Sequence, residues 1–296
     1  MSYILQTSHL SKRIGGKELV SDVNIHVKKG EIYGFLGPNG AGKTTVMKMV
    51  TNLWKPTEGT IALFGRLLEP SSYELFQRMG SIIEFPAFYE YMSGRDNLQV
   101  HCEYMGYYKK GSVEEALGML DLTEAADVPV KNYSLGMKQR LGIVRAVLCR
   151  PELVILDEPT NGLDPVGMKK IRDLFRMLCT EYGMTFMISS HLLSEIESIA
   201  DTVGVIHHGR MMREISMQEI AEMNTAYIEF VVEDTRKAAY VLAEKMGLEY
   251  FKIVGDSEIR IYDQGITTQK AAKELMKNGV ELVSISRHTE NLENFF

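Results

Sequence analysis

Cysteine is scarce in this 296-residue sequence, and its three cysteines lie far apart. Cys102, Cys149 and Cys179 match neither the spacing of a zinc site nor that of a redox pair. Each lies in a partly apolar segment with helical periodicity. We therefore expect reduced thiols packed in the core of a cytoplasmic protein.

Long apolar runs and a basic excess are also missing. No apolar run reaches the ~18–20 residues that a membrane span needs, and the first residues, 1–5, turn polar too soon for a signal peptide. The formal net charge is -6 with acids and bases interspersed, which argues against a nucleic-acid binder that relies on a basic face. The length allows one large domain or two ordinary ones, with ample chain for a core.

The strongest motif that is present is a glycine-rich segment of the form Gly, four residues, Gly-Lys-Ser/Thr. An apolar run at 32–36 predicts a buried strand before it, and apolar residues at helical spacing predict a helix after it. Glycines let successive N–H groups face phosphate oxygens, and the helix adds its positive end. We expect Lys43 to contact the β- and γ-phosphates of a nucleotide, and the Thr44 hydroxyl to bind magnesium. The expected nucleotide-binding residues of this phosphate loop are Gly37, Pro38, Asn39, Gly40, Ala41, Gly42, Lys43, Thr44 and Thr45.

Two further polar groups follow predicted strands. The apolar run 153–156 ends in Asp157 and Glu158, at the strand edge where open α/β sheets place ligands. Asp157 suits a magnesium ligand, and Glu158 suits a base that orients or deprotonates the attacking water. His191 follows another strand and suits a hydrogen bond to a γ-phosphate or to that water. For His101, His207 and His208, a surface or core role is the better hypothesis.

The order of predicted elements indicates an α/β nucleotide-binding core with an insertion. Short strands are predicted up to residue 29. A helical subdomain is predicted at about 85–149, with helix-start signals at Ser93 and Ser112, the latter as a capping box with Glu115. The core resumes at 153 and closes with a hairpin near 202–212. Residues 216–296 follow the order β-α-β-β-α-β, which predicts a small ferredoxin-like α+β module.

Five motifs in order resemble those of the ATP-binding subunit of an ABC (ATP-binding cassette) transporter. Besides the phosphate loop, Asp157–Glu158 and His191, the segment Asn161–Pro165 resembles the dimer-contact loop with Asp164. The signature motif is matched by Ser134, Leu135, Gly136 and Met137. The resemblance covers roughly residues 2–215. It implies a P-loop ATPase of this family, with a nucleotide-binding domain at 1–215 and an accessory domain at 216–296.

The chain departs from the family pattern at three places. Leu135 and Met137 replace Gly and Gln of the signature, a variant similar to the drug and peptide-antibiotic exporters. Ile14 stands where the family usually stacks adenine on an aromatic ring, which leaves weaker stacking or another ring such as Tyr3 open. Glu84 replaces a Gln between core and insert, as in exporters of bacitracin and lantibiotics, and we expect it to engage magnesium when Mg-ATP is bound.

The resemblance implies ATP and Mg²⁺ as cofactors and two subunits paired head to tail, as a homodimer or with a homologue. Ser134 would then act in trans, Asp164 at the dimer contact, and Lys43, Glu158 and His191 in catalysis. A separate membrane permease would export a bacitracin-like peptide, a lantibiotic or another bacteriocin, or a hydrophobic drug, giving resistance or immunity. The chain would sit on the inner face of a bacterial membrane, with the permease docked near residues 84–91.

Two other functions stay open at this point. One is a soluble relative acting on ribosomes or nucleic acid, although such relatives commonly fuse two cassettes and this chain has one and no basic linker. The other is a regulatory nucleotide binder without hydrolysis, which the intact Lys43, Asp157, Glu158 and His191 disfavour. No nucleic-acid partner is expected.

Overall fold

A computed structural model describes residues 3–223, 227–248, 250–263 and 265–288. The chain divides into two compact units, Met1–Met217 and Gln218–Phe296. Within the described ranges, no helix combines the length and apolar character that crossing a bilayer requires.

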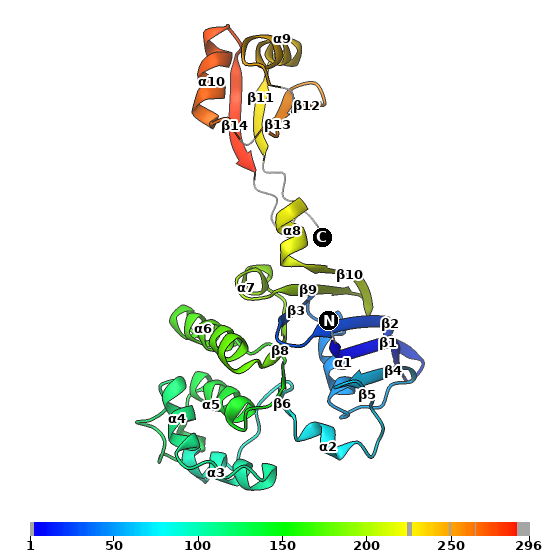
Figure 1. The fold of residues 1–296 in the computed structure, drawn as a ribbon, viewed down its shortest axis with the longest axis vertical. Coiled ribbons are helices and arrows are strands. Elements are labelled where there is room, and N and C mark those ends of the chain that lie inside the picture. The colour runs from blue at the N-terminus through cyan, green and yellow to red at the C-terminus, as the bar shows by residue number, and fades with distance from the viewer. Residues whose placement is uncertain (1–2, 224–226, 249, 264, 289–296) are drawn as a thin grey trace. The chain divides into compact units, whose positions relative to one another are not determined.

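A six-stranded sheet in the order β10-β9-β3-β8-β7-β6 forms the centre of the first unit (Figure 1). Five strands are mutually parallel, and the sixth joins antiparallel through the turn His208–Gly209. Carboxyl ends of parallel strands meet at one edge of a sheet, so the segments after β3, β7 and β8 come together there. The strands are β3 Ile32–Leu36, β6 Met79–Ile82, β7 Leu153–Leu156, β8 Thr185–Ser190, β9 Thr202–His207 and β10 Arg210–Ser216.

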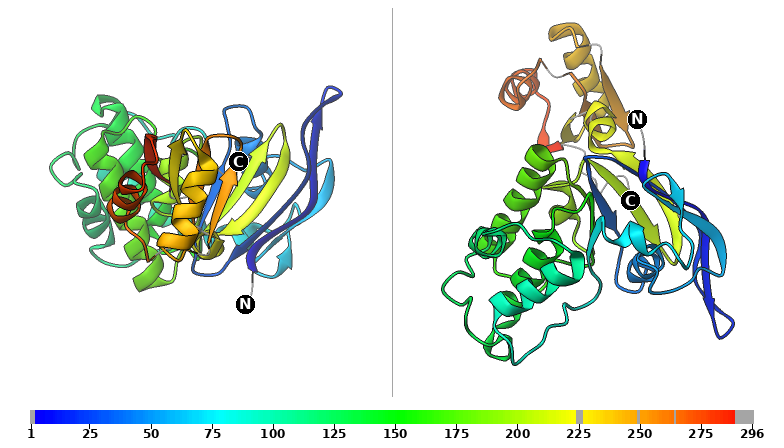
Figure 2. Two further views of the ribbon diagram at one scale, coloured as in Figure 1. Left: turned by 90° about the horizontal axis from the view of Figure 1, so that it is seen from above. Right: turned by 60° about the horizontal axis from the view of Figure 1, so that its bottom comes forward.

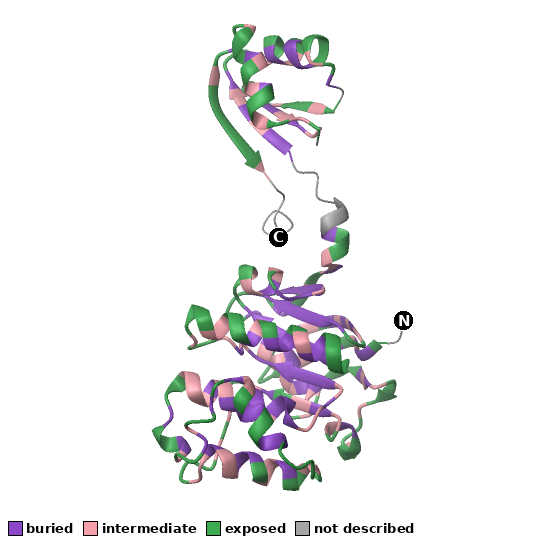
Figure 3. Cartoon of the chain, turned by 60° about the vertical axis from the view of Figure 1, so that its left-hand side comes forward, coloured by how far each residue is buried: buried purple, intermediate pink, exposed green. Residues whose placement is uncertain are grey.

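Side chains of this sheet alternate between two cores. Leu153 and Ile155 of β7 pack with α1 (Lys43–Val50) and a second sheet, whereas Val154 and Leu156 pack with the helices on the opposite face. Figures 1 and 2 show this layering, and Figure 3 shows the central strands buried. The sheet is therefore apolar on both faces, as the uninterrupted apolar run at 153–156 predicted.

The second sheet is antiparallel, in the order β2-β1-β4-β5. The sequence predicted short strands up to residue 29, and this was wrong in length, because β1 and β2 each span 12 residues. Irregular register between them, for example from Thr7 to Leu10, lets one long ribbon continue past breaks in the apolar alternation. The strands are β1 Tyr3–Ile14, β2 Lys17–Lys28, β4 Glu58–Leu63 and β5 Arg66–Leu67.

The predicted helical insert contains α3 (Gly94–Met105), α4 (Ser112–Met119) and α5 (Leu135–Leu148). Ser93 caps α3 through a complete capping box with Asp96. The predicted box at Ser112 was wrong, because Gly111 at φ 79° is the N-cap and Ser112 is already helical. Its hydroxyl donates to the Lys109 carbonyl instead, at 2.8 Å. The other helices of this unit are α2 Tyr73–Phe76, a 3₁₀ turn Val130–Asn132, α6 Pro165–Tyr182 and α7 Leu193–Glu197, and α8 Met217–Met223 begins at the boundary between the two units.

The second unit is a four-stranded antiparallel sheet with helices over one face. Its strand order, β12-β13-β11-β14, combined with the chain order β-α-β-β-α-β, is that of a ferredoxin-like module. Phe230 and Ile259 are fully buried in the core between sheet and helices. The elements are β11 Tyr227–Val232, α9 Thr235–Tyr240, a π-helical turn Val241–Lys245, β12 Phe251–Val254, β13 Glu258–Ile261, α10 Thr268–Lys277 and β14 Leu282–His288.

All three cysteines are free thiols. Cys102 and Cys179 are buried and Cys149 is half-buried, which confirms the predicted core role. Burial and the neighbouring Cys102 raise the pKa of the Cys149 thiol to about 12, so the reactive thiolate is disfavoured.

Candidate active site

The phosphate loop connects the end of β3 to the start of α1. All five residues of β3 are buried, so the loop leaves a rigid strand. Gly42 is the N-cap of α1 at φ 110°, and a Cβ there would lie 2.6 Å from Val20 Cγ1. Only glycine fits this conformation and this close approach, which explains the glycine just before Lys43 in the motif.

Lys43 is the first residue of α1 and its side chain is almost fully buried. Its Nζ donates to the carbonyls of Gly37 at 2.6 Å and Pro38 at 3.3 Å, and lies 3.2 Å from Glu158 Oε1. The ammonium is thus surrounded by oxygens at the mouth of the loop. When a nucleotide binds, its phosphate oxygens would take the place of these neutral carbonyls as acceptors for Lys43. Hydrogen bonds to charged acceptors are stronger than those to neutral ones.

Thr44 and Asp157 bring a hydroxyl and a carboxylate together from α1 and from the end of β7. Thr44 Oγ1 donates to Asp157 Oδ2 at 2.7 Å, and Ser189 Oγ donates to Asp157 Oδ1 at 2.6 Å. Adjacent hard oxygen donors are what Mg²⁺ prefers, so these two residues fit a magnesium ion. No preformed cluster of three acidic, histidine or cysteine ligands occurs among the described residues.

Glu158 follows Asp157 in a left-handed backbone conformation, at φ 49°. Its N–H donates to Ser189 Oγ at 2.9 Å, and its Oε2 lies 2.8 Å from His191 Nδ1. The other oxygen, Oε1, is buried and makes the Lys43 ion pair but no hydrogen bond. The structure therefore brings the predicted catalytic groups together, with Lys43 on one carboxylate oxygen of Glu158 and His191 on the other.

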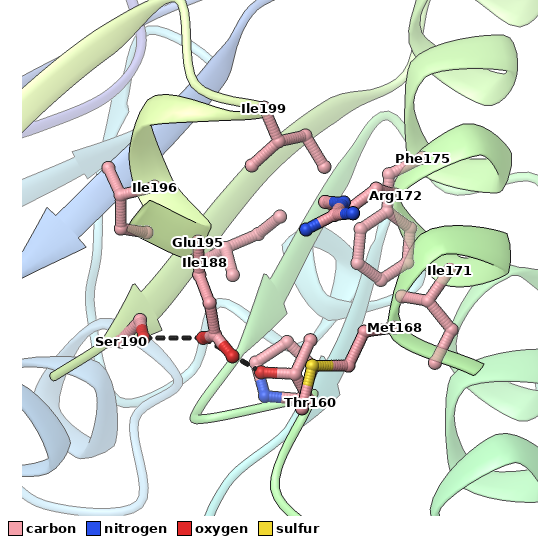
Figure 4. A pocket seen from close by; sticks show the side chains of 11 residues that line it. Thr160, Met168, Ile171, Arg172, Phe175, Ile188, Ser190, Glu195, Ile196 and Ile199 are labelled. Atoms are coloured by element: carbon pink, nitrogen blue, oxygen red, sulfur yellow. Dashed lines mark hydrogen bonds between the residues drawn. The ribbon is translucent and has the colours of Figure 1, made fainter. Parts of the chain in front are cut away.

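Glu195 of α7 links the loop after β7 to the last residue of β8 (Figure 4). Its Oε2 accepts hydrogen bonds from Thr160 Oγ1 at 2.9 Å and Ser190 Oγ at 2.6 Å. Because Ser190 precedes His191 and Thr160 follows Glu158 by two residues, this carboxylate fixes the backbone on both sides of the Glu158–His191 contact.

Glu84 lies two residues beyond β6, also at positive φ, 62°. Its Oε1 accepts from Lys48 Nζ at 2.7 Å, and Lys48 lies over the Trp54 ring at 4.8 Å. The carboxylate is about half exposed, and the described contacts place it on Lys48 and not on Thr44 or Asp157. The expected magnesium role of Glu84 is untested by this arrangement.

The signature residues form a separate hollow on the same unit. Ser134 is the N-cap of α5, and its Oγ accepts from the Met137 N–H at 3.2 Å. Ser134, Leu135, Gly136 and Asp164 help to line a cavity of about 530 Å³. Within the described part of the chain, no hydrogen bond or ion pair joins these residues to the phosphate loop.

The dimer-contact candidate and the adenine candidate are also placed. Asp164 is the N-cap of α6, accepting from the Gly167 N–H at 3.1 Å. Ile14 ends β1 and is 49% exposed, and Tyr3 packs on His26 with ring centroids 5.2 Å apart. Ile14 therefore offers an exposed apolar side chain but no ring, and Tyr3 already has an aromatic partner.

Sequence reasoning missed three supporting residues: Ser189, Lys48 and Glu195. Ser189 contacts both Asp157 and the Glu158 N–H, and its place one residue before Ser190-His191 was the available signal. Lys48 lies one helical turn after Thr44, which places it on the same face of α1. Nothing in the sequence marked Glu195, since its partners are the last residue of β8 and a residue of the loop after β7.

A family model for ABC transporters matches residues 20–161. The chain is 52% identical over its whole length to an uncharacterized ABC transporter ATP-binding protein, YcbN of Bacillus subtilis, covering 96% of that protein. It is 44% identical over its whole length to the bacitracin transport ATP-binding protein BcrA of Enterococcus faecalis, covering 96% of it. It is 43% identical over 71% of its length to the lantibiotic transport ATP-binding protein SrtF of Streptococcus pyogenes, covering 90% of that protein.

Among solved structures, the chain is similar to one described as the ATP-binding subunit of an ABC transporter. The TM-score is 0.69 at 27% identity, with 74% of this chain and 92% of the other covered.

Proposed function

This chain belongs to the ATP-binding proteins of ABC transporters, and from that membership we propose that it powers export of a peptide antibiotic through a separate membrane permease. It binds ATP and hydrolyses it in a cycle coupled to transport. The observation that best supports a competent ATPase is the contact of Lys43, Glu158 and His191 beside the phosphate loop.

In this proposal each residue of the site has one task. The loop 37–45 holds the phosphates with its N–H groups, and Lys43 neutralises charge on the β- and γ-phosphates. Glu158 Oε1 accepts the proton of the attacking water, while His191, held by Oε2, orients that water and the γ-phosphate. Ser189 fixes Asp157 and Glu158 relative to one another.

Thr44 and Asp157 would hold the magnesium ion, whose chemistry would be to neutralise phosphate charge. Glu84 would join them when Mg-ATP is bound, by leaving Lys48. An isolated third carboxylate near Asp157 and Glu158 is unfavourable because like charges repel. The ion pair with Lys48 offsets that repulsion here, which supports a Glu84 that exchanges one cation for another.

The active unit would be a head-to-tail dimer of two such chains or of this chain with a homologue. The 530 Å³ hollow beside Ser134 and Asp164 lies apart from the phosphate loop of its own chain. A second subunit that brought its phosphate loop there would complete each site. Ser134, with Leu135, Gly136 and Met137, would then contact the γ-phosphate in trans.

Export of bacitracin-like peptides or lantibiotics is supported by the relatives, whose names state transport of those compounds. Hydrophobic drugs remain a further substrate class in this proposal. The chain would then sit at the inner face of the membrane, held by the permease near residues 84–91, and would give the cell resistance or immunity.

Two measurements test this proposal in the native bacterium. Deleting the gene should sensitise cells to bacitracin, to a lantibiotic or to a hydrophobic drug, and the Lys43→Ala chain should fail to restore resistance. The tagged chain should sediment with membranes only when its permease is present. Unchanged sensitivity to all three compound classes, or membrane attachment without the permease, would contradict the proposal.

A further inference from the structure

The turn between β9 and β10 is bonded directly to the phosphate loop. The N–H of Gly209 in this turn donates to the Ala41 carbonyl at 2.9 Å, and the Gly209 carbonyl accepts from the Ser21 N–H of β2 at 2.8 Å. A Cβ at Gly209 would lie 2.5 Å from the carbonyl oxygen of Leu19, so the turn packs closely on β2. The turn is therefore fixed beside the loop that is expected to hold the phosphates.

Two imidazole rings lie at this turn. His207 is the last residue of β9, and His208 follows it in a left-handed conformation at φ 46°. Both residues are exposed, and their ring centroids are 4.0 Å apart. His9, His26 and His191 each lie against a carboxylate, whereas the two rings at the turn make no hydrogen bond or ion pair with any described residue. The two rings are thus available to a partner from outside the chain.

The strand order sets the direction expected for a bound nucleotide. β3, which leads into the phosphate loop, lies between β8 and β9. Glu158 and His191, the residues expected at the γ-phosphate, follow β7 and β8 on one side of the loop. A nucleotide with its γ-phosphate there extends its nucleoside toward the opposite side, over the end of β9. Because Leu36 pairs with Val205, His208 lies beyond the end of β3 on that side.

The tip of the β1–β2 hairpin lies near this turn and carries no aromatic ring. Ile14 pairs with Lys17 at the tip, and Lys17 is two residues before Leu19, which packs on the turn. Ile14 offers an exposed apolar side chain, and the ring of Tyr3 packs on His26. The nucleoside side of the site therefore has an apolar residue from the hairpin and two unengaged rings from the turn.

We propose that His208, with His207 packed against it, is the ring on which this chain stacks the adenine of ATP. The inference rests on the ATP binding described under the proposed function and adds the residue that holds the base. Ile14 covers the base from the hairpin side. His208 thereby takes the task that the family usually gives to an aromatic residue at position 14.

An imidazole suits this task because the flat faces of a base and of an aromatic ring attract each other. Stacking of one base on an aromatic side chain contributes about 5- to 150-fold to affinity. The contact with His207 restricts the ring of His208 before the base arrives, so less side-chain freedom is lost on binding.

The test compares the binding of Mg-ATP with that of inorganic triphosphate, which lacks the base, by calorimetry on the purified full-length chain. His208→Asn removes the ring but suits the left-handed backbone, because asparagine adopts this conformation more readily than most residues. It should weaken ATP binding about 5-fold or more and leave triphosphate binding unchanged. His208→Phe keeps a ring and should bind ATP as the wild type does.

His9→Asn is the matched control, because His9 is also exposed and left-handed, at φ 51°, but lies against Asp22. It should bind both ligands as the wild type does. Proton NMR gives a direct readout of the contact. The imidazole C–H signals of His208, identified by their loss in His208→Asn, should shift with ATP and not with triphosphate.

Wild-type ATP affinity in His208→Asn overturns the inference. An equal loss of ATP and triphosphate binding overturns it as well, because the turn would then only support the phosphate loop. So does His208→Phe that binds ATP as weakly as His208→Asn, since the ring would be irrelevant. Wild-type chain that binds neither ligand instead overturns the ATPase function on which the inference rests.

Discussion

Glu158 contacts an imidazole through one carboxylate oxygen and an ammonium through the other. Oε2 is held by His191, and Oε1 faces the Lys43 ammonium at 3.2 Å without a hydrogen bond. Once phosphate oxygens draw Lys43 away, a carboxylate that His191 orients through one oxygen would be suited to accept a proton from water on the other. An amide has the same shape but accepts no proton.

Glu158→Gln should therefore retain ATP binding and lower the hydrolysis rate by ~10²–10⁴-fold, the range for a positioned base. It should also trap an ATP-bound dimer. Steady-state ATPase assays, nucleotide binding and size-exclusion chromatography with ATP measure these three effects. Turnover near the wild-type rate would exclude Glu158 as the base.

Glu84 shares Lys48 with the ring of Trp54, so its charge is balanced while it is away from Asp157. Glu84→Gln keeps an acceptor oxygen and loses the charge. Resistance that depends on export should fall more than ATP affinity does, because the phosphate loop is untouched. Glu84→Ala should impair export further while leaving the fold intact.

Resistance, ATPase rate and the magnesium dependence of that rate are the measurements for Glu84. Lys48→Met is a useful companion, because it removes the cation that holds Glu84 away from magnesium. It should lower the magnesium concentration that the ATPase needs, whereas the two Glu84 variants should raise it. Wild-type values of all three quantities in both Glu84 variants would show that this residue has no special role.

At the scale of elements, α7 is short, but its residue Glu195 connects the end of β8 with the loop that follows β7. Glu195 accepts from Thr160 and Ser190. Glu195→Ala leaves the hydroxyls of buried Ser190 and half-buried Thr160 without this acceptor, which should lower the free energy of unfolding by about 1–3 kcal/mol. It should also lower kcat more than it weakens ATP binding, because His191 and Glu158 lose their fixed spacing.

Glu195→Gln keeps one acceptor oxygen and should fall between wild type and Glu195→Ala in both respects. Chemical denaturation and ATPase kinetics on the same preparations separate the two effects. Reduced stability with an unchanged kcat would mean that Glu195 supports the fold alone.

At the scale of the whole molecule, each chain carries one phosphate loop and one signature hollow that do not touch within the described residues. Lys43→Ala should inactivate the first and Ser134→Arg the second. Mixing the two variants should create dimers with one intact site and recover part of the ATPase rate. Equal amounts of each variant alone provide the control.

A mixture that performs as the sum of its inactive parts would show either that the chains do not pair head to tail or that both sites are needed. Cysteine cross-linking between positions near Ser134 and Gly40 of two chains decides between these outcomes. A cross-link without recovered activity indicates that both sites are needed, and its absence contradicts the pairing.

The sequence by itself determined the features that depend on local chemistry. The phosphate loop, the buried strand before Asp157, the helix start at Ser93 and the β-α-β-β-α-β order of the second unit each follow from short-range patterns of glycine, apolar and capping residues. Ser112 shows where such patterns fail: its residues suit a capping box, but the backbone turn at Gly111 started the helix one residue earlier.

Only the tertiary structure decided which distant side chains meet. Lys48 with Glu84, Glu195 with Thr160, and Arg145 with Ala87 join segments that are separated in the chain and share no motif. Strand order in the parallel sheet brings these segments together, and that order is a long-range property that no local pattern encodes.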